Sequence, residues 1–134
     1  MKNSTAIVLV LALCILSGCS GEKSETVSNK SNMSGPGIVL IVNSEACKCT
    51  RERCASAEGY VTEALGKRDL SSKLRIVDYA KEHERAVGLL KQHRVHFIPV
   101  VLVFDENGNV LYKNEDDIDH ADFEKALTQL KGRK

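Results

Sequence analysis

The chain has no tryptophan and only two prolines, and aromatic residues make up just 4% of its 134 residues. Charge of either sign is also not in excess, with 19 Lys and Arg against 18 Asp and Glu. No basic patch is interleaved with aromatic residues, so the sequence lacks the cationic and stacking surfaces that nucleic-acid binding uses. We therefore expect no nucleic-acid partner.

A membrane-spanning apolar run is missing as well. The longest run extends from Ala6 to Leu16, eleven residues, whereas a helix that crosses a bilayer needs about 20. Lys2 precedes this run and small residues follow it, which is the layout of an export signal. We expect residues 1–18 to be a signal peptide that is removed.

The residues that end this run, Leu16-Ser17-Gly18-Cys19, resemble the bacterial lipobox. The resemblance implies that Cys19 is acylated, for example with palmitate, and becomes the first residue of the mature chain. An ordinary export signal and an uncleaved anchor are the alternatives. We expect a protein of the cell envelope, anchored to a membrane by lipid, with its domain facing the periplasm or the exterior.

Residues 19–35 have the composition of a tether. Between Ser20 and Gly35 only Val27 and Met33 are apolar, and the rest is rich in Ser, Asn, Lys, Glu and Gly. Such a segment cannot bury enough surface to offset the entropy lost on ordering, so we expect a flexible linker. One domain then remains, residues 36–134, which is long enough for a single modest core.

The apolar pattern of this domain predicts alternating strands and helices. Gly37 to Asn43 is a continuous apolar, β-branched run, as in a strand buried on both faces, and helical spacing follows from Thr50 to Gly66. The further elements expected are strands at 74–78, 99–104 and 110–113, a charged helix with Ala86, Val87 and Leu90 on one face, and a last helix with Phe123, Ala126, Leu127 and Leu130 on one face.

Two short signals fix the end of this order. Asn107-Gly108 predicts a hairpin between the last two strands, and Asp119, in an acidic stretch from Glu115, is expected to cap the last helix. We read the rest of that stretch as solvated. The order is β-α-β-α-β-β-α, and its strand–helix–strand crossovers imply parallel pairing. The expected fold class is α/β, a mixed four-stranded sheet with helices on both faces.

Three cysteines, Cys47, Cys49 and Cys54, lie where the first strand gives way to the first helix. Residues five apart on a helix rise about 7.5 Å, beyond the Cα separation of about 7 Å that a disulfide tolerates, so Cys49 and Cys54 are not expected to bond. Cys47 and Cys49 are close enough, although their small ring would be strained and easily reduced. We predict that these two form the redox pair.

Each cysteine has an expected role. Cys47 lies nearest the helix start, where unpaired amides and basic neighbours favour a thiolate, so it is the predicted nucleophile and Cys49 its resolving partner. Cys54 falls on the apolar stripe of the helix, where a free cysteine packs as a small hydrophobe. A second resolving role or a metal-ligand role for Cys54 stays open.

The element order, the cysteines after the first strand, and Ile98-Pro99-Val100 ahead of the Asn107-Gly108 hairpin resemble the thioredoxin-like family. The resemblance covers nearly all of residues 36–134. It implies that the Ile98–Pro99 bond is cis, that Pro99 faces the cysteines, and that the domain carries out thiol–disulfide exchange.

The chain departs from the family pattern at the site itself. The family's Cys-x-x-Cys is absent, because Thr50 stands where the second cysteine would follow Cys47. Ala46 stands in place of the usual tryptophan, and Ile41 lies near the position of the buried acid. The resemblance therefore implies a variant Cys-x-Cys site.

These observations predict a membrane-tethered thiol–disulfide oxidoreductase that acts on exported protein thiols or disulfides, or on a membrane thiol reductant. Its reactive groups would be cysteines, with Pro99 beside them and no other cofactor. One alternative is a soft-metal module for copper, mercury or zinc, with Cys47, Cys49, Cys54 and His96 as ligands. The other is a non-catalytic binding domain.

Overall fold

The computed structural model describes residues 37–132. The expected export signal, the acylated Cys19 and the tether lie outside the described residues. Within residues 37–132 no helix is both long and apolar enough to cross a membrane.

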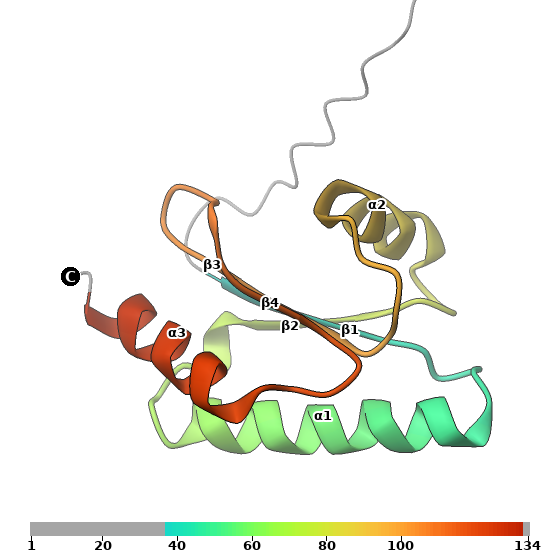
Figure 1. Cartoon of the computed structure of the whole chain (residues 1–134), viewed down its shortest axis with the longest axis horizontal. Coiled ribbons are helices and arrows are strands. Elements are labelled where there is room, and N and C mark those ends of the chain that lie inside the picture. The colour runs from blue at the N-terminus through green and yellow to red at the C-terminus, as the bar shows by residue number, and fades with distance from the viewer. Residues whose placement is uncertain (1–36, 133–134) are drawn as a thin grey trace, which may run out of the picture.

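The described chain forms one four-stranded sheet with helices on both faces (Figure 1). Its elements are β1 (Gly37–Val42), α1 (Lys48–Gly66), a short 3-10 helix η1 (Ser71–Lys73), β2 (Leu74–Asp78), α2 (His83–His93), β3 (Val100–Phe104), β4 (Val110–Glu115) and α3 (His120–Gly132). The strands lie in the order β2-β1-β3-β4. β1 pairs in parallel with β2, whereas the pairs β1–β3 and β3–β4 are antiparallel. The predicted fold class and element order are confirmed.

Helices α1 and α3 cover one face of the sheet and α2 covers the other (Figure 1). Alternate residues of β1 point to opposite faces: Ile38 and Leu40 join the core under α1 and α3, and Val39 and Ile41 join the core under α2. Every residue of β1 and β3 is buried. This two-sided burial explains why both strands read as unbroken apolar runs.

Several element boundaries differ from the prediction. Helix α1 begins at Lys48 rather than Thr50, because the carbonyl of Cys47 already accepts the N–H of Arg51. On α2, Ala86 and Leu89 are buried and the predicted Leu90 packs, partly buried, against the same core, so Leu89 is the core residue that the prediction missed. β4 extends to Glu115 instead of ending at 113.

The predicted hairpin turn and the predicted cap of the last helix are both present in the structure. Gly108 has a φ of 79°, as the hairpin turn requires, and the carboxylate of Asp119 accepts the N–H of Asp122 at 3.0 Å at the start of α3. The Ile98–Pro99 bond is cis, as predicted. β3 begins at Val100, one residue after Pro99, which has no N–H to donate to the sheet.

Candidate active site

The cysteines lie at the carboxyl end of β1, where the chain turns into α1. Cys47 is the N-cap residue, with extended backbone angles (φ −56°, ψ 159°), and its carbonyl accepts the first helical bond, from Arg51 N–H at 3.0 Å. Cys49 and Thr50 follow within the first turn. We call residues 47–50 the cysteine turn. The thiols therefore sit beside the amino end of a 19-residue helix, where backbone amides lack helical acceptors.

The sulfur atoms of Cys47 and Cys49 lie 2.9 Å apart. Both residues are exposed, and both are free thiols rather than partners in a disulfide. The Cys47 sulfur also lies 3.2 Å from the hydroxyl oxygen of Thr50. Hydrogen bonding from Cys49, followed by that from the side chain and backbone of Thr50, lowers the pKa of the Cys47 thiol from 9.0 to about 7. Thr50, three residues after Cys47, thus helps to stabilise the Cys47 thiolate.

Cys54 has a different environment. Its side chain is only 5% exposed and packs in the core under α1 and α3, on the same stripe as Ala57 and Val61. Burial raises the pKa of its thiol, although a backbone hydrogen bond from Asn43 opposes this. The interpretation of Cys54 as a small core hydrophobe is consistent with this placement.

Asp78, which the sequence did not single out, holds the loop that leads to the cysteine turn. It ends β2 beside Val42, and its carboxylate accepts the N–H groups of Ser44 and Ala80, each at 3.1 Å. Lys81 pairs with it at 3.4 Å. Partial burial disfavours the charged form, but these hydrogen bonds and the ion pair outweigh it and lower the pKa of Asp78 to about 2.

Residues 95–99, here called the pre-β3 segment, run toward the same end of the sheet as the cysteine turn (Figure 1). Ile41 pairs with Val100, so the start of β3 lies beside the end of β1. Pro99 is buried, His96 is exposed, and Phe97 is 66% exposed, which is unusual for a large apolar side chain. The pre-β3 segment therefore leads into β3 beside the end of β1, and the facing of Pro99 toward Cys47 stays a prediction.

The end of β4 contacts both parts of the site. Glu115 accepts backbone N–H groups of the pre-β3 segment, and Asp116 bonds to Pro99 and to Arg53 of α1. The predicted solvated cap is present at Asp119, whereas Glu115 and Asp116 are half-buried and bonded to other segments. No pattern in the sequence marks these contacts, because they join residues about 20 and 60 positions apart.

The structure does not assemble the alternative metal site. Among residues 37–132 no group of three or more His, Cys, Asp or Glu side chains is placed to hold a metal ion. Cys54 is buried, and the exposed His96 is fixed through its backbone N–H by Glu115. The four predicted ligands therefore do not converge in this structure.

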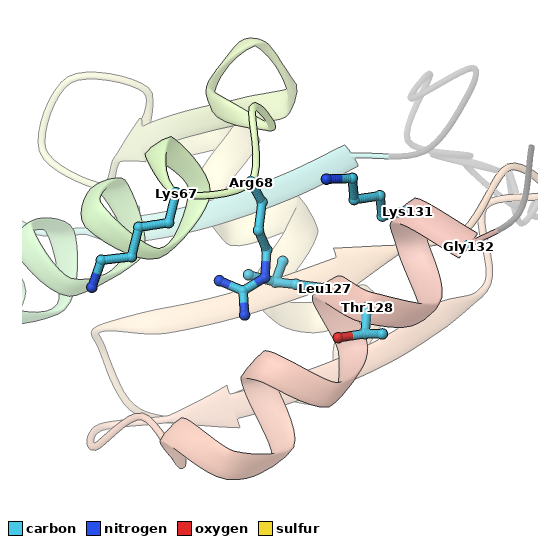
Figure 2. A pocket seen from close by; sticks show the side chains of 6 residues that line it. All are labelled: Lys67, Arg68, Leu127, Thr128, Lys131 and Gly132. Carbon is cyan, nitrogen blue, oxygen red and sulfur yellow. The ribbon is translucent and has the colours of Figure 1, made fainter.

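A concave region lies at the far end of α1 and holds none of the predicted site residues (Figure 2). Arg68 extends from the end of α1 toward α3, where it forms an ion pair with Glu124 and also donates to the carbonyl of Ala64 at 3.1 Å. Lys67, Leu127, Thr128, Lys131 and Gly132 complete the lining. The guanidinium is thus used to join two helices.

Comparison with known proteins bears on the fold. No protein-family model matches the sequence, and no curated protein matches it. Among solved structures, an uncharacterized thioredoxin-like protein from Clostridium perfringens is similar at a TM-score of 0.54 and 20% identity, over 75% of each chain. The oxidised C-terminal domain of DsbD from Neisseria meningitidis (TM-score 0.48, 16% identity, 72% of this chain and 80% of that one) is also similar. StoA from Bacillus subtilis is similar at a TM-score of 0.40 and 12% identity, over 70% of this chain and 83% of that one.

The first of these similarities, together with the observed topology, shows a thioredoxin-like fold. The candidate site on this fold is a pair of neighbouring exposed thiols at the start of α1, and the cis Ile98–Pro99 bond precedes β3, whose start pairs with the end of β1.

Proposed function

We propose that the chain is a thiol–disulfide oxidoreductase in which Cys47 is the nucleophile and Cys49 the resolving thiol. The observation that carries the proposal is the Cys47 thiol itself. It is exposed, its pKa is lowered to about 7, and its sulfur lies 2.9 Å from that of Cys49. A thiol with a pKa near ambient pH combines a large thiolate fraction with good nucleophilicity.

The exchange proceeds in two steps. The Cys47 thiolate attacks a partner disulfide, forms a mixed disulfide and releases one partner thiolate. Cys49 then loses its proton and attacks the Cys47 sulfur, which closes the Cys47–Cys49 disulfide and releases the second partner thiol. The partner gains two electrons and the chain loses two, so a dithiol reductant must restore the reduced form. The reverse sequence would oxidise a partner dithiol.

The pre-β3 segment supplies a surface for the partner. Phe97 offers an exposed apolar ring, and the backbone around Ile98 lies beside the end of β1 that leads to the cysteine turn. An extended partner segment that pairs with this backbone would bring its disulfide to Cys47. The proposed partners are therefore exported proteins or a membrane thiol reductant, which also fits the proposed export and acylation at Cys19.

A set of cysteine variants tests the proposal. The soluble domain, residues 36–134, is reduced, mixed with a peptide disulfide, and followed by mass spectrometry. Wild type should lose two hydrogens and release a peptide dithiol. Cys47→Ser should abolish the reaction, and Cys49→Ser should stop at the mixed disulfide with Cys47.

The matched control is Cys54→Ala, which removes the buried thiol and should leave both steps intact. The proposal fails if Cys47→Ser exchanges as fast as wild type. It also fails if Cys54→Ala, rather than Cys49→Ser, traps the mixed disulfide, because Cys54 would then be the resolving thiol.

A further inference from the structure

Glu115, the last residue of β4, holds the backbone of the pre-β3 segment. One oxygen of its carboxylate, Oε2, accepts the N–H groups of His96 at 2.9 Å and Phe97 at 3.1 Å. These are two consecutive residues, and they lie just ahead of the Ile98–Pro99 bond. Hydrogen bonds to a charged acceptor are stronger than those between neutral groups, so Glu115 fixes two successive backbone units at once.

Asp116 links the same segment to α1. Its backbone N–H donates to the carbonyl of Pro99 at 2.8 Å, and its carboxylate accepts a hydrogen bond from the Arg53 guanidinium. Arg53 lies four residues after Cys49, one turn along the same face of α1. The hydrogen bond with Asp116, and then the negative charge of Asp116, raise the pKa of Arg53, with smaller contributions from the charges of Asp117 and Cys49. Hydrogen bonds thus run from Arg53, one helical turn beyond Cys49, through Asp116 to Pro99.

We propose that Glu115 and Asp116 are positioning residues, which hold the pre-β3 segment in a fixed position relative to the cysteine turn. The inference rests on the proposed function in one respect: a partner segment bound to the pre-β3 backbone must present its disulfide to the Cys47 sulfur. Such alignment contributes to rate only when both reacting groups are held in place. A reagent that touches only the sulfur gains nothing from it.

This difference defines the substrate class. The contacts of Glu115 and Asp116 matter for a disulfide carried by a polypeptide, which spans the pre-β3 segment and the cysteine turn. They do not matter for a small alkylating reagent such as iodoacetamide. Comparison of the two rates separates positioning from an effect on the thiol itself.

Three variants of the soluble domain test the proposal, with one matched control. Glu115→Ala removes the shared acceptor. Asp116→Asn removes the charge that faces Arg53, and asparagine tolerates the φ of 68° at this position, so the backbone is preserved. Arg53→Met breaks the link from α1. The control, Asp117→Asn, makes the same charge change at the next residue, which is exposed.

Hydrogen exchange, followed by NMR, reports the positioning directly. Glu115→Ala should accelerate exchange of the His96 and Phe97 amides about tenfold or more, since each loses a charged acceptor. Asp116→Asn and Arg53→Met remove an exposed ion pair, so they should accelerate the Asp116 amide about two- to fivefold. Asp117→Asn should leave all three amides unchanged.

The kinetic arm uses a peptide disulfide and iodoacetamide in parallel. Glu115→Ala should slow exchange with the peptide disulfide about tenfold, while the alkylation rate of Cys47 and its pH profile stay within about twofold. A fourth variant, Arg53→Lys, keeps the charge and should recover part of the rate lost in Arg53→Met. Melting temperatures confirm that each variant is folded under the assay conditions.

Two results would overturn the proposal. In the first, folded Glu115→Ala undergoes thiol–disulfide exchange with the peptide as fast as wild type does. In the second, alkylation of Cys47 slows as much as thiol–disulfide exchange does, which would place the effect on the thiol itself. If wild type itself proves inert toward the peptide disulfide, the proposed function fails. Amide hydrogen exchange in the Glu115, Asp116 and Arg53 variants then still decides whether these residues hold the pre-β3 segment. Hydrogen-exchange rates equal to those of wild type would overturn the positioning role as well.

Discussion

At the scale of single residues, the acidity of Cys47 is the property on which the proposed chemistry depends. Its pKa, lowered to about 7 mainly by hydrogen bonding from Cys49, puts half of the thiol in the thiolate form near neutral pH. Thr50 contributes a second hydrogen bond. Because only the thiolate reacts, alkylation of Cys47 should rise with pH to half of its plateau near pH 7.

Mass spectrometry of the iodoacetamide-treated domain at several pH values measures this profile. Cys54 supplies the internal comparison, because burial both shields its sulfur and raises its pKa. Thr50→Val, which removes one hydrogen bond, should move the Cys47 midpoint to higher pH. Faster labelling of Cys54 than of Cys47 at pH 7 would contradict both assignments.

Asp78 gives a second prediction at this scale, and its sign follows from linkage. Its pKa is about 2 in the folded domain against an ordinary 3.8, so its stabilising contribution is complete above about pH 4 and is lost as pH falls toward 2. Asp78→Asn should lower the free energy of unfolding at neutral pH and flatten its decline between pH 4 and 2.

Urea unfolding across this pH range tests the effect of Asp78. Asp69→Asn is the matched control, because Asp69 is exposed and asparagine is tolerated at its φ of 58°. An equal loss of stability in both variants would show that the contacts of Asp78 with Ser44 and Ala80 contribute nothing particular.

At the scale of elements, α1 carries the cysteine turn at one end and a link to α3 at the other. Arg68 forms that link through Glu124 and the carbonyl of Ala64, with its side chain only 26% exposed. Arg68→Met should lower stability by about 1 kcal/mol, a value at the upper end for exposed ion pairs because this one is partly buried. For a domain of this size, that loss lowers the melting temperature by about 4–8 °C.

The neighbouring residue provides the control for this measurement. Lys67 pairs with Glu63 on the surface of α1, where both side chains are 67% exposed, so Lys67→Met should change the melting temperature far less. Equal effects of the two substitutions would mean that the contact between α1 and α3 does not depend on Arg68.

The elements themselves could be predicted from the sequence, and the contacts between them could not. Two-sided burial left β1 and β3 as unbroken apolar runs, and the spacing of residues such as Phe123 and Leu127 marked a helix face. The placement of Cys54 in the core followed from the same periodicity. Asp78, Glu115 and Asp116 carry no such signal, because their role arises only when distant segments meet.

At the scale of the whole molecule, the sheet topology determines which end of the domain carries the thiols proposed to react. β1 runs parallel to β2 and antiparallel to β3, so the carboxyl ends of β1 and β2 meet the start of β3 at one end. The cysteine turn, Asp78 and the pre-β3 segment all lie there. Gly37, where the described chain begins, lies at the other end of β1 and pairs with Phe104. The proposed tether would therefore join the domain on the side away from the thiols.

This arrangement, combined with the proposed acylation of Cys19, makes a prediction about the complete protein. In bacterial cells, wild type should fractionate with membranes, and Cys19→Ala should be released into the soluble fraction of the envelope or the medium, because one lipid-modified residue would supply the anchor. The released variant should keep the thiol reactivity of Cys47, since the domain that carries this thiol is unaltered.

Immunoblots of separated fractions and alkylation of the same samples measure both properties. Cys47→Ala is the matched control, which should stay with membranes while losing the reactive thiol. A Cys19→Ala protein that still fractionated wholly with membranes would contradict the lipid anchor.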